Sequence, residues 1–384
     1  MRLLHTGDWH VGKQLRGAGR ADEHRGVLAE IVSIAAAEEV DLVIVAGDLF
    51  DTAAPPPEAQ AIVYDALLAL AAGGTEVVVI AGNHDNARAL AALTPLFARS
   101  GVRIVSEPVR PTDGGVHRFT AADGAAVNVA LLPFVSKRGI VRAEQLMSTA
   151  AYEQAGLYSQ RMHQLLGALS APFAADAVNV LVGHAFVHGG VSGGGERAAH
   201  LVEEYAVLAP SFPATAGYVA LGHLHRAQQI AGATAIHYPG SPLQLDFGET
   251  AGSKQVNVVE LEPGLPARVR AVELRAGRAL RTYTGTLDQL IATVEDDDAW
   301  LRLVVREAHL AGLGQEARER FGERVVDVRI EAPVSSPAAA VATRRGRSPH
   351  ELFAEYMATR SVDDPRVSAL FADLLDELST EPAS

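Results

Sequence analysis

Histidine and aspartate recur in five short segments among residues 1–225 of the chain. In order, the segments are Asp8-Trp9-His10, Gly47-Asp48, Gly82-Asn83-His84-Asp85, Gly183-His184 and Gly222-His223-Leu224-His225. Imidazole nitrogens and carboxylate oxygens are common ligands of divalent metal ions. One histidine beside one aspartate means little, but five such segments predict a single shared site.

The ligand types indicate a pair of metal ions. Two ions about 3.5–4 Å apart need a bridging ligand, and a carboxylate can bridge them with its two oxygens. Asp48 is the best candidate because it follows Gly47 at the end of an expected strand. Nitrogen and oxygen ligands without sulfur fit Mn²⁺, Fe²⁺ or Zn²⁺ better than Mg²⁺ alone. A metal pair of this kind is suited to hydrolysing a phosphate ester with an activated water.

The other candidate ligands supply imidazole, carboxylate and amide groups. They are Asp8, His10, Asn83, His184, His223 and His225. Asp8 and His10 are two residues apart on an extended loop and can therefore reach one ion together. His223 and His225 point to the same side of an extended segment and could serve two adjacent ions.

His84 directly follows the candidate ligand Asn83. We expect that it does not bind metal but contacts the scissile phosphate and protonates or stabilises the leaving oxygen. Asp85 is then expected to orient His84 from behind the ligands.

Short apolar runs precede almost every one of the five segments. Strands are expected at Arg2–Thr6, Leu42–Ala46, Glu76–Ala81, Val127–Leu132, Val178–Val182 and Tyr218–Leu221. Helical patterns lie between them at Glu23–Glu39 and Glu58–Ala71. Alternating strands and helices predict an α/β architecture, in which functional groups collect beyond the carboxyl ends of the strands.

Changes of pattern divide the chain into four parts. We expect a first domain over residues 1–265, ending after a strand at Gln255–Leu261. Residues 266–335 are expected to form a small α/β domain with the order strand, helix, strand, helix, strand. Residues 336–347 have the Ala-, Ser-, Pro- and Arg-rich composition of a linker. Residues 348–384 are expected to form helices, and the second helix has an apolar stripe that could pack on its own domain or on a partner.

Composition and charge limit the class of protein. The 384 residues are 48% hydrophobic and 21% charged, as in an ordinary globular protein, and the net charge is −13. This charge argues against a protein that coats nucleic acid, but bound divalent ions would offset several carboxylates of a metal-dependent nuclease. The lack of cysteine excludes thiolate zinc sites and fits a reducing compartment. Without a long apolar stretch, and with a candidate ligand already at Asp8, the chain is expected to be cytoplasmic, with no membrane contact.

The five segments, in this order, resemble those of the calcineurin-like metallophosphoesterases, whose motifs run D-x-H, G-D, G-N-H-D/E, G-H and G-H-x-H. Within that superfamily, residues 1–262 resemble the SbcD nucleases. The segments that carry this resemblance are His5–Gly12, Ala46–Asp51, Ala220–Gln228 and Tyr238–Pro242. It implies a sandwich of two sheets flanked by helices, a small capping domain that contacts DNA, and C-terminal helices.

The resemblance also implies how the ligands divide between two divalent ions, expected to be Mn²⁺. One ion would be held by Asp8, His10, Asp48 and His225. The other would be held by Asp48, Asn83, His184 and His223. His84 matches the family's catalytic histidine. Lys13, Arg16 and Arg20 follow the first ligands and either contact a DNA backbone or form an ordinary solvated loop.

The implied function is a DNA nuclease for repair and recombination. It would degrade duplex ends as an exonuclease and cut single strands or hairpins as an endonuclease. The implied partner is an SbcC-type coiled-coil ATPase bound to the C-terminal helices, with a homodimer of this chain inside a heterotetramer. Two rival hypotheses are a small substrate, such as a phosphomonoester, cyclic nucleotide or phosphoprotein, and a non-enzymatic scaffold. The complete ligand set argues against the scaffold.

Overall fold

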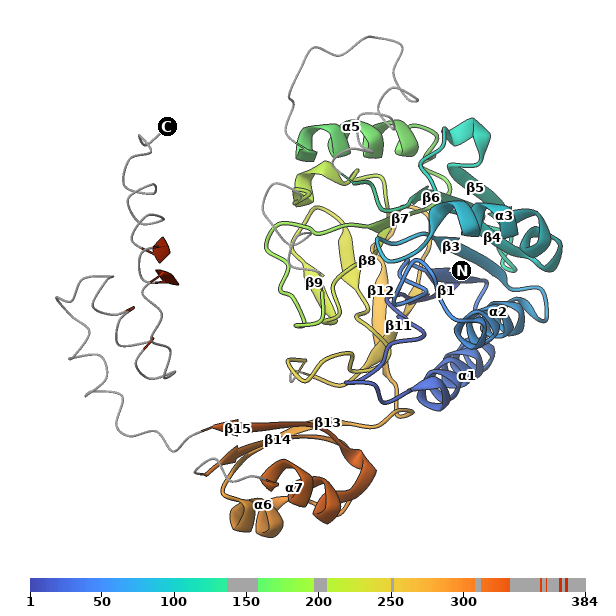
Figure 1. Cartoon of the computed structure of the whole chain (residues 1–384). Helices are drawn as coiled ribbons and strands as arrows, with labels where there is room; N and C mark the ends of the chain where they lie inside the picture. The colour runs from blue at the N-terminus through green and yellow to red at the C-terminus, as the bar shows by residue number, and fades with distance from the viewer. Residues whose placement is uncertain are drawn as a thin grey trace.

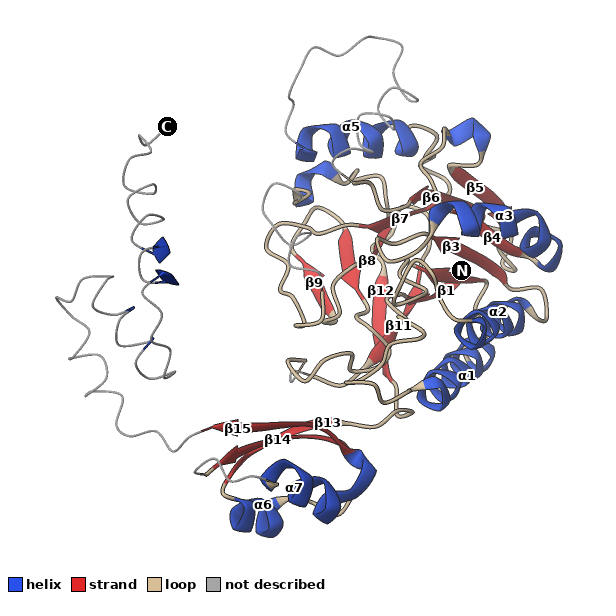
Figure 2. Ribbon diagram, viewed as in Figure 1, coloured by secondary structure: helices blue, strands red, loops and turns tan. Residues whose placement is uncertain are grey.

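Two six-stranded sheets face each other in the computed structural model of the chain (Figure 2). The structure describes residues 1–136, 158–196, 206–249, 252–307 and 312–331, and six single residues between 353 and 371. In spatial order, the first sheet contains β12 (Arg268–Glu273), β11 (Gln255–Glu260), β1 (Arg2–Thr6), β2 (Leu42–Val45), β3 (Glu76–Ile80) and β4 (Val102–Val105). The second contains β5 (Val116–Thr120), β6 (Ala126–Leu132), β7 (Val178–His184), β8 (Tyr218–Gly222), β10 (Ala235–Tyr238) and β9 (Gln228–Ile230).

The neighbouring strands β2 and β3 of the first sheet are parallel and almost entirely buried, which explains the apolar runs Leu42–Val45 and Val77–Ile80. In β2, Leu42 and Ile44 point into the core between the two sheets. The alternate residues, Val43 and Val45, pack on the other side, against the helices. The period of two therefore gives each strand two apolar faces, and both are covered.

Helices cover the outer face of each sheet (Figure 1). The apolar sides of α1 (Ala21–Ala37), α2 (Pro57–Ala71) and α3 (Ala87–Phe97) share one core with the first sheet. The second sheet packs its outer face against α5 (Tyr158–Ser170). Short 3₁₀ helices lie at η1 (Ala98–Ser100), η2 (Pro111–Asp113), η5 (Ala209–Ser211) and η6 (Gly322–Arg324). Among the described residues, no helix combines the length and the apolar character needed to cross a bilayer.

A small domain follows the sandwich in the chain (Figure 1). Its parallel sheet consists of β13 (Leu280–Gly285), β14 (Trp300–Arg306) and β15 (Val325–Glu331), packed against α6 (Leu287–Thr293) and α7 (Leu313–Phe321). Glu23 of α1 ties the two parts together, because its carboxylate accepts hydrogen bonds from Trp300 Nε1 and from the backbone N–H of Arg278, each at 2.8 Å.

The predicted α/β sandwich, its six expected strands and its first two helices are confirmed. The domain boundary needs a correction, because β12 pairs with β11 along its whole length and completes the first sheet. The small domain therefore begins after Glu273 and not at residue 266. The strands β4, β5, β9, β10 and β12 and the helices α3 and α5 were not predicted. The expected linker at 336–347 lies outside the described residues, as does the tail from 348 apart from six positions.

Candidate metal centre

The five histidine- and aspartate-bearing segments meet at the carboxyl ends of five strands. They follow or end β1, β2, β3, β7 and β8, and the first three of these strands are neighbours in one sheet. Backbone hydrogen bonds join the first two segments: Asp8 N donates to the carbonyl of Gly47 at 2.9 Å, and His10 N to that of Asp48 at 3.0 Å. The predicted convergence therefore takes place at one edge of the sandwich.

The two sheets come into close contact at Gly222, the last residue of β8. A Cβ atom there would lie 1.9 Å from the carbonyl oxygen of Ala46, which follows β2. This contact between backbones brings the His223–His225 segment of the second sheet against the Asp48 loop of the first.

Four of the predicted ligands have a left-handed backbone, which is costly for residues other than glycine. Their φ angles are 51° at Asp8, 47° at His10, 51° at Asp48 and 106° at His223. The surrounding hydrogen bonds hold this strained backbone, since the Asp8 carboxylate accepts from His223 N at 2.9 and 3.0 Å. Strain gathered in this way is typical of a functional site.

One group of donors consists of Asp8, His10 and His225, all buried, whose ligand atoms lie within 4.8 Å of one another. The Nε2 atoms of His10 and His225 are 3.1 Å apart. His225 Nδ1 faces a carboxylate, Glu249 Oε1, at 3.1 Å, so Nδ1 carries the proton and Nε2 presents its lone pair. The lone pair on His225 Nε2, the neighbouring His10 Nε2 and the Asp8 carboxylate are together suited to bind a cation.

The second group gathers around Asn83. His184 donates its Nδ1–H to the carbonyl of Ala46 at 2.7 Å, which leaves Nε2 directed at Asn83 Oδ1, 3.0 Å away. His223 Nδ1 lies 2.8 Å from the same oxygen. Asp48 belongs to both groups, because its Oδ2 lies 3.5 Å from His10 Nε2 and 3.5 Å from His184 Nε2. The donor set therefore fits two divalent ions with Asp48 between them.

Comparison with known proteins agrees with this geometry. A model of the calcineurin-like phosphoesterase family matches residues 1–227. The SbcD protein of the SbcCD nuclease of Bacillus subtilis (strain 168) is 36% identical over 329 residues, which cover 83% of this chain and 83% of that protein. The chain belongs to the SbcD family of calcineurin-like phosphoesterases.

Two further SbcD proteins give the same result. The protein from Escherichia coli (strain K12) is 30% identical over 308 residues, covering 77% of this chain and 74% of the relative. The protein from Rhodobacter capsulatus is 33% identical over 280 residues, covering 70% and 68%. Membership in the SbcD family and the clustered donors make this chain a metal-dependent hydrolase of phosphate esters with a dinuclear site.

The electrostatics of the SbcD site favour bound positive charge. Burial raises the pKa of the Asp8 carboxyl to about 6. Burial alone would also raise the pKa of Asp48, but the imidazoles around it hold that pKa well below its usual range. For His184, burial would lower the pKa, yet the charges of Asp48 and Asp8 raise it to about 9. The buried carboxylates thus attract a cation, and a divalent ion offsets two of them at once.

His84 lies beside the predicted metal ligands, close to His10 and Asp48. Its ring is edge-on to that of His10, with centroids 4.6 Å apart, and its Nδ1 donates to the carbonyl of Asp51 at 2.6 Å. His84 is 8% exposed, whereas His10 is 1% and His225 3% exposed. Its greater exposure suits a residue that meets an incoming phosphate.

The expected role of Asp85 needs a correction. Its carboxylate accepts backbone N–H groups of Leu49 at 3.3 Å, Phe50 at 3.1 Å and Gly82 at 2.8 Å. Asp85 therefore joins the Asp48 loop to the Asn83 loop, and the bond that fixes the ring of His84 comes from the Asp51 carbonyl. Backbone partners of this kind leave no signal in a sequence.

The three basic residues expected to face either DNA or solvent have different surroundings. Arg20 is only 2% exposed and binds Glu23 at 2.8 and 3.0 Å, so it is a structural residue and neither hypothesis holds for it. Lys13 lies 3.2 Å from Asp51. Arg16 has a side chain that is 60% exposed and lies 3.8 Å from Asp327 of the small domain.

Sequence reasoning missed two carboxylates that contact His225. Glu249 binds its Nδ1, and Glu196 accepts its backbone N–H at 2.9 Å. Burial alone would raise the pKa of Glu249, but the hydrogen bond from His225 and the charge of Lys254 hold it at about 2. Both glutamates come from loops outside the five segments, and no spacing rule points to them.

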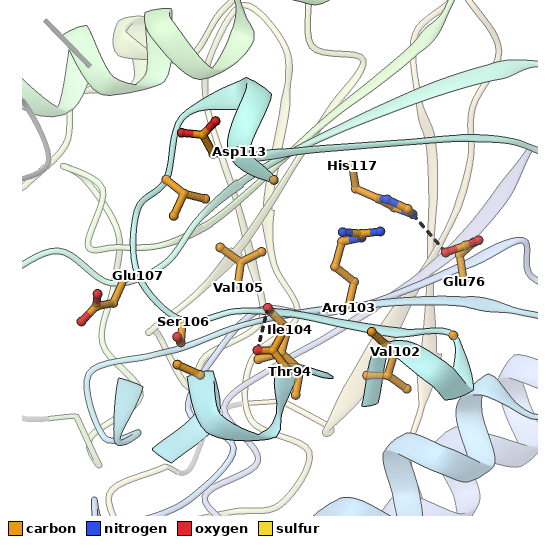
Figure 3. A pocket seen from close by; sticks show the side chains of 15 residues that line it. Glu76, Thr94, Val102, Arg103, Ile104, Val105, Ser106, Glu107, Asp113 and His117 are labelled. Carbon is orange, nitrogen blue, oxygen red and sulfur yellow. Dashed lines mark hydrogen bonds and ion pairs between the residues drawn. The ribbon is translucent and has the colours of Figure 1, made fainter. Parts of the chain in front are cut away.

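A separate hollow of about 470 Å³ lies along the edge strand β4 and the helix η2 (Figure 3). Its polar lining includes Arg103 and His117, whose Nε2 is 3.0 Å from Glu76 Oε2. None of the predicted metal ligands lines this hollow, so the phosphoesterase chemistry lies at the strand ends and not here.

Proposed function

We propose that this chain is the nuclease subunit of an SbcCD-type complex that processes DNA ends. It would act as an exonuclease on duplex ends and as an endonuclease on single strands and hairpins. The observation that carries this proposal is a complete set of donors for two ions in a chain 36% identical to a protein named as an SbcCD nuclease subunit.

We propose Mn²⁺ as the native ion, on the chemistry of the donors. The two groups offer nitrogen and oxygen but no sulfur, since the chain has no cysteine. Asp8, His10, Asp48 and His225 would hold one ion, and Asp48, Asn83, His184 and His223 the other. When bound, such a pair lowers the pKa of a water molecule and offsets the charge of the phosphate.

The residues of the chain have separate tasks in the proposed reaction. His84, whose Nδ1 is held by the Asp51 carbonyl, presents Nε2 to the phosphate and stabilises or protonates the leaving oxygen. Asp48 keeps the backbone N–H of His84 on its Oδ1 at 2.8 Å, so the catalytic histidine is fixed to the bridging ligand. Arg16 is exposed and lies near Asp327 of the small domain, and we propose that it contacts a DNA phosphate.

The partner we propose is an SbcC-type coiled-coil ATPase, with a homodimer of this chain in a heterotetramer. The relatives are named as subunits of SbcCD. In the tail, Phe353 and Phe371 stack with centroids 3.8 Å apart, while Leu370 is 60% and Val367 37% exposed. Exposed apolar side chains beside a packed pair are suited to helix docking.

A deletion tests the proposed role of the tail. Removal of the residues after Ala338 should abolish capture of the ATPase and leave Mn²⁺ binding unchanged. Undiminished capture by the shortened chain would contradict docking through the tail.

The activity is tested by comparing substrates. With Mn²⁺, the wild-type chain should cut duplex ends and a DNA hairpin, and a cyclic nucleotide far more slowly. His84→Ala should lose about 10²–10⁴-fold in cleavage rate and still bind two equivalents of Mn²⁺. His163→Ala, on the exposed side of α5, is the matched control and should behave as wild type. Faster cleavage of the cyclic nucleotide than of DNA would favour the small-substrate hypothesis, and full activity in His84→Ala would remove its catalytic role.

A further inference from the structure

Glu249 lies directly behind His225, on the side away from the other ligands. Its side chain is buried, and its two oxygens have different partners. Oε1 accepts the Nδ1–H of His225 at 3.1 Å. Oε2 accepts from Lys254 Nζ at 2.7 Å and from Leu245 N at 3.2 Å. A buried carboxylate therefore stands between an imidazole and an ammonium group.

The same lysine also reaches the backbone of His225. Lys254 Nζ donates to the carbonyl of His225 at 3.3 Å and to Ser241 Oγ at 2.8 Å. Ser241 N donates to that carbonyl as well, at 3.2 Å. These bonds fix the main chain of His225 while Glu249 fixes its ring.

The turn that contains Ser241 can reach His225 only because residue 240 is glycine. Gly240 has a φ of 78°, and a Cβ there would lie 2.7 Å from the carbonyl oxygen of His225 and 2.8 Å from Ala227 N. The Tyr238–Pro242 segment, which sequence analysis noted without a role, thus packs against the ligand loop.

The arrangement has a definite effect on the imidazole. A carboxylate on Nδ1 selects the tautomer that leaves the lone pair on Nε2, and it makes that lone pair a stronger donor. Nε2 of His225 lies 3.1 Å from His10 Nε2, so the lone pair is directed into the first donor group. The charge of Lys254 stabilises Glu249 as an anion, so the proton stays on Nδ1.

We propose that Glu249 and Lys254 are a positioning pair that orients His225 for one of the two metal ions, held in place by the Gly240-Ser241 turn. This inference rests on the role of His225 as a ligand in the proposed function. Glu249 contacts the ring of His225 and Lys254 contacts its backbone carbonyl, so in this proposal the pair acts through His225.

The test is Mn²⁺ titration of the full chain by calorimetry, with Glu249→Gln as the main variant. Glutamine has one acceptor oxygen where glutamate has two, so it can serve His225 or Lys254 but not both. We expect about 10–100-fold weaker binding of one ion and unchanged binding of the other. Glu260→Gln, which removes an equal charge from an exposed side chain, should bind both ions as wild type does.

A second variant separates positioning from folding. Glu249→Met combined with Lys254→Met leaves no unpaired buried charge and no acceptor for the Nδ1–H of His225, so it should restore the thermal midpoint of the metal-free chain while the weak metal binding persists. Recovery of both midpoint and affinity in this double variant would show a purely structural role and overturn the proposal. Wild-type affinity in Glu249→Gln would overturn it too, whereas a wild-type chain that binds no Mn²⁺ would defeat the proposed function from which it starts.

Discussion

The substitution Gly222→Ala should separate the two halves of the metal centre. A Cβ at this position would lie 1.9 Å from the Ala46 carbonyl oxygen, and ordinary contacts begin at about 3.4 Å. The two backbones would therefore have to move apart by about 1.5 Å, the difference between these distances. Neither can move freely, because β2 and β8 are buried strands in different sheets.

The expected loss follows from what the two strands hold. The Ala46 carbonyl accepts the Nδ1–H of His184, and His223 directly follows Gly222. Overpacking costs about 1–3 kcal/mol of unfolding free energy, and a misplacement of about 1 Å can reduce catalysis about 10²-fold. We expect a folded protein with a lowered thermal midpoint, weak Mn²⁺ binding and at least 10²-fold slower cleavage of DNA.

The matched control is Gly217→Ala, one residue before the same strand. A Cβ there would lie 3.4 Å from Leu261 Cδ2 and 3.6 Å from the Asn179 carbonyl oxygen, both ordinary contacts. The readouts are Mn²⁺ calorimetry, thermal unfolding and a duplex-end cleavage assay on both variants. If Gly222→Ala matched Gly217→Ala in all three, close contact between the sheets would not be what assembles the site.

Three other substitutions test buried charge, DNA contact and protonation. Arg20→Ala should lower the free energy of unfolding by about 3–5 kcal/mol, because it leaves the largely buried Glu23 without its charged partner, and should leave the salt dependence of DNA binding unchanged. Arg16→Ala should leave the free energy of unfolding unchanged and should reduce the salt dependence of DNA binding. Equal urea midpoints for Arg20→Ala and Arg16→Ala would contradict the structural role of Arg20. Burial lowers the pKa of His5 to about 3, against about 6.5 in an unfolded chain. Between these values the unfolded state binds a proton that the folded state does not, so stability should fall as pH decreases from about 6.5 towards 3. His5→Gln should show a smaller fall in urea midpoint between pH 7.5 and 5, and an identical fall would remove His5 as a cause.

The strands and the convergence of the proposed metal ligands could be predicted because each proposed ligand lies at the end of a strand or no more than four residues beyond it. Leu42–Val45 is an unbroken apolar run, and Asp48 comes three residues after it. A short apolar strand, a glycine and a polar residue are all local features, so their order along the chain is enough to place them at one edge of a sheet.

Predictions failed where residue type alone does not reveal which contacts a residue makes. Arg20 was grouped with the basic residues of a loop, but its guanidinium binds Glu23 and the carbonyl of Gln244. Residues 268–273 were placed in the small domain with no strand expected there, but they form β12 and pair with β11, and such pairing depends on register and not on composition. In both cases tertiary contacts decide the outcome.

The directions of the histidine lone pairs in this site could not be predicted from the sequence. Three imidazoles are oriented by a partner on Nδ1: His184 by the Ala46 carbonyl, His84 by the Asp51 carbonyl and His225 by Glu249. Two of these partners are backbone carbonyls, which every residue has and no substitution of a side chain removes. Of these three Nδ1 partners, only Glu249 is a side chain. A substitution of Glu249 can therefore change the orientation of a ligand, His225, while all the proposed ligands remain.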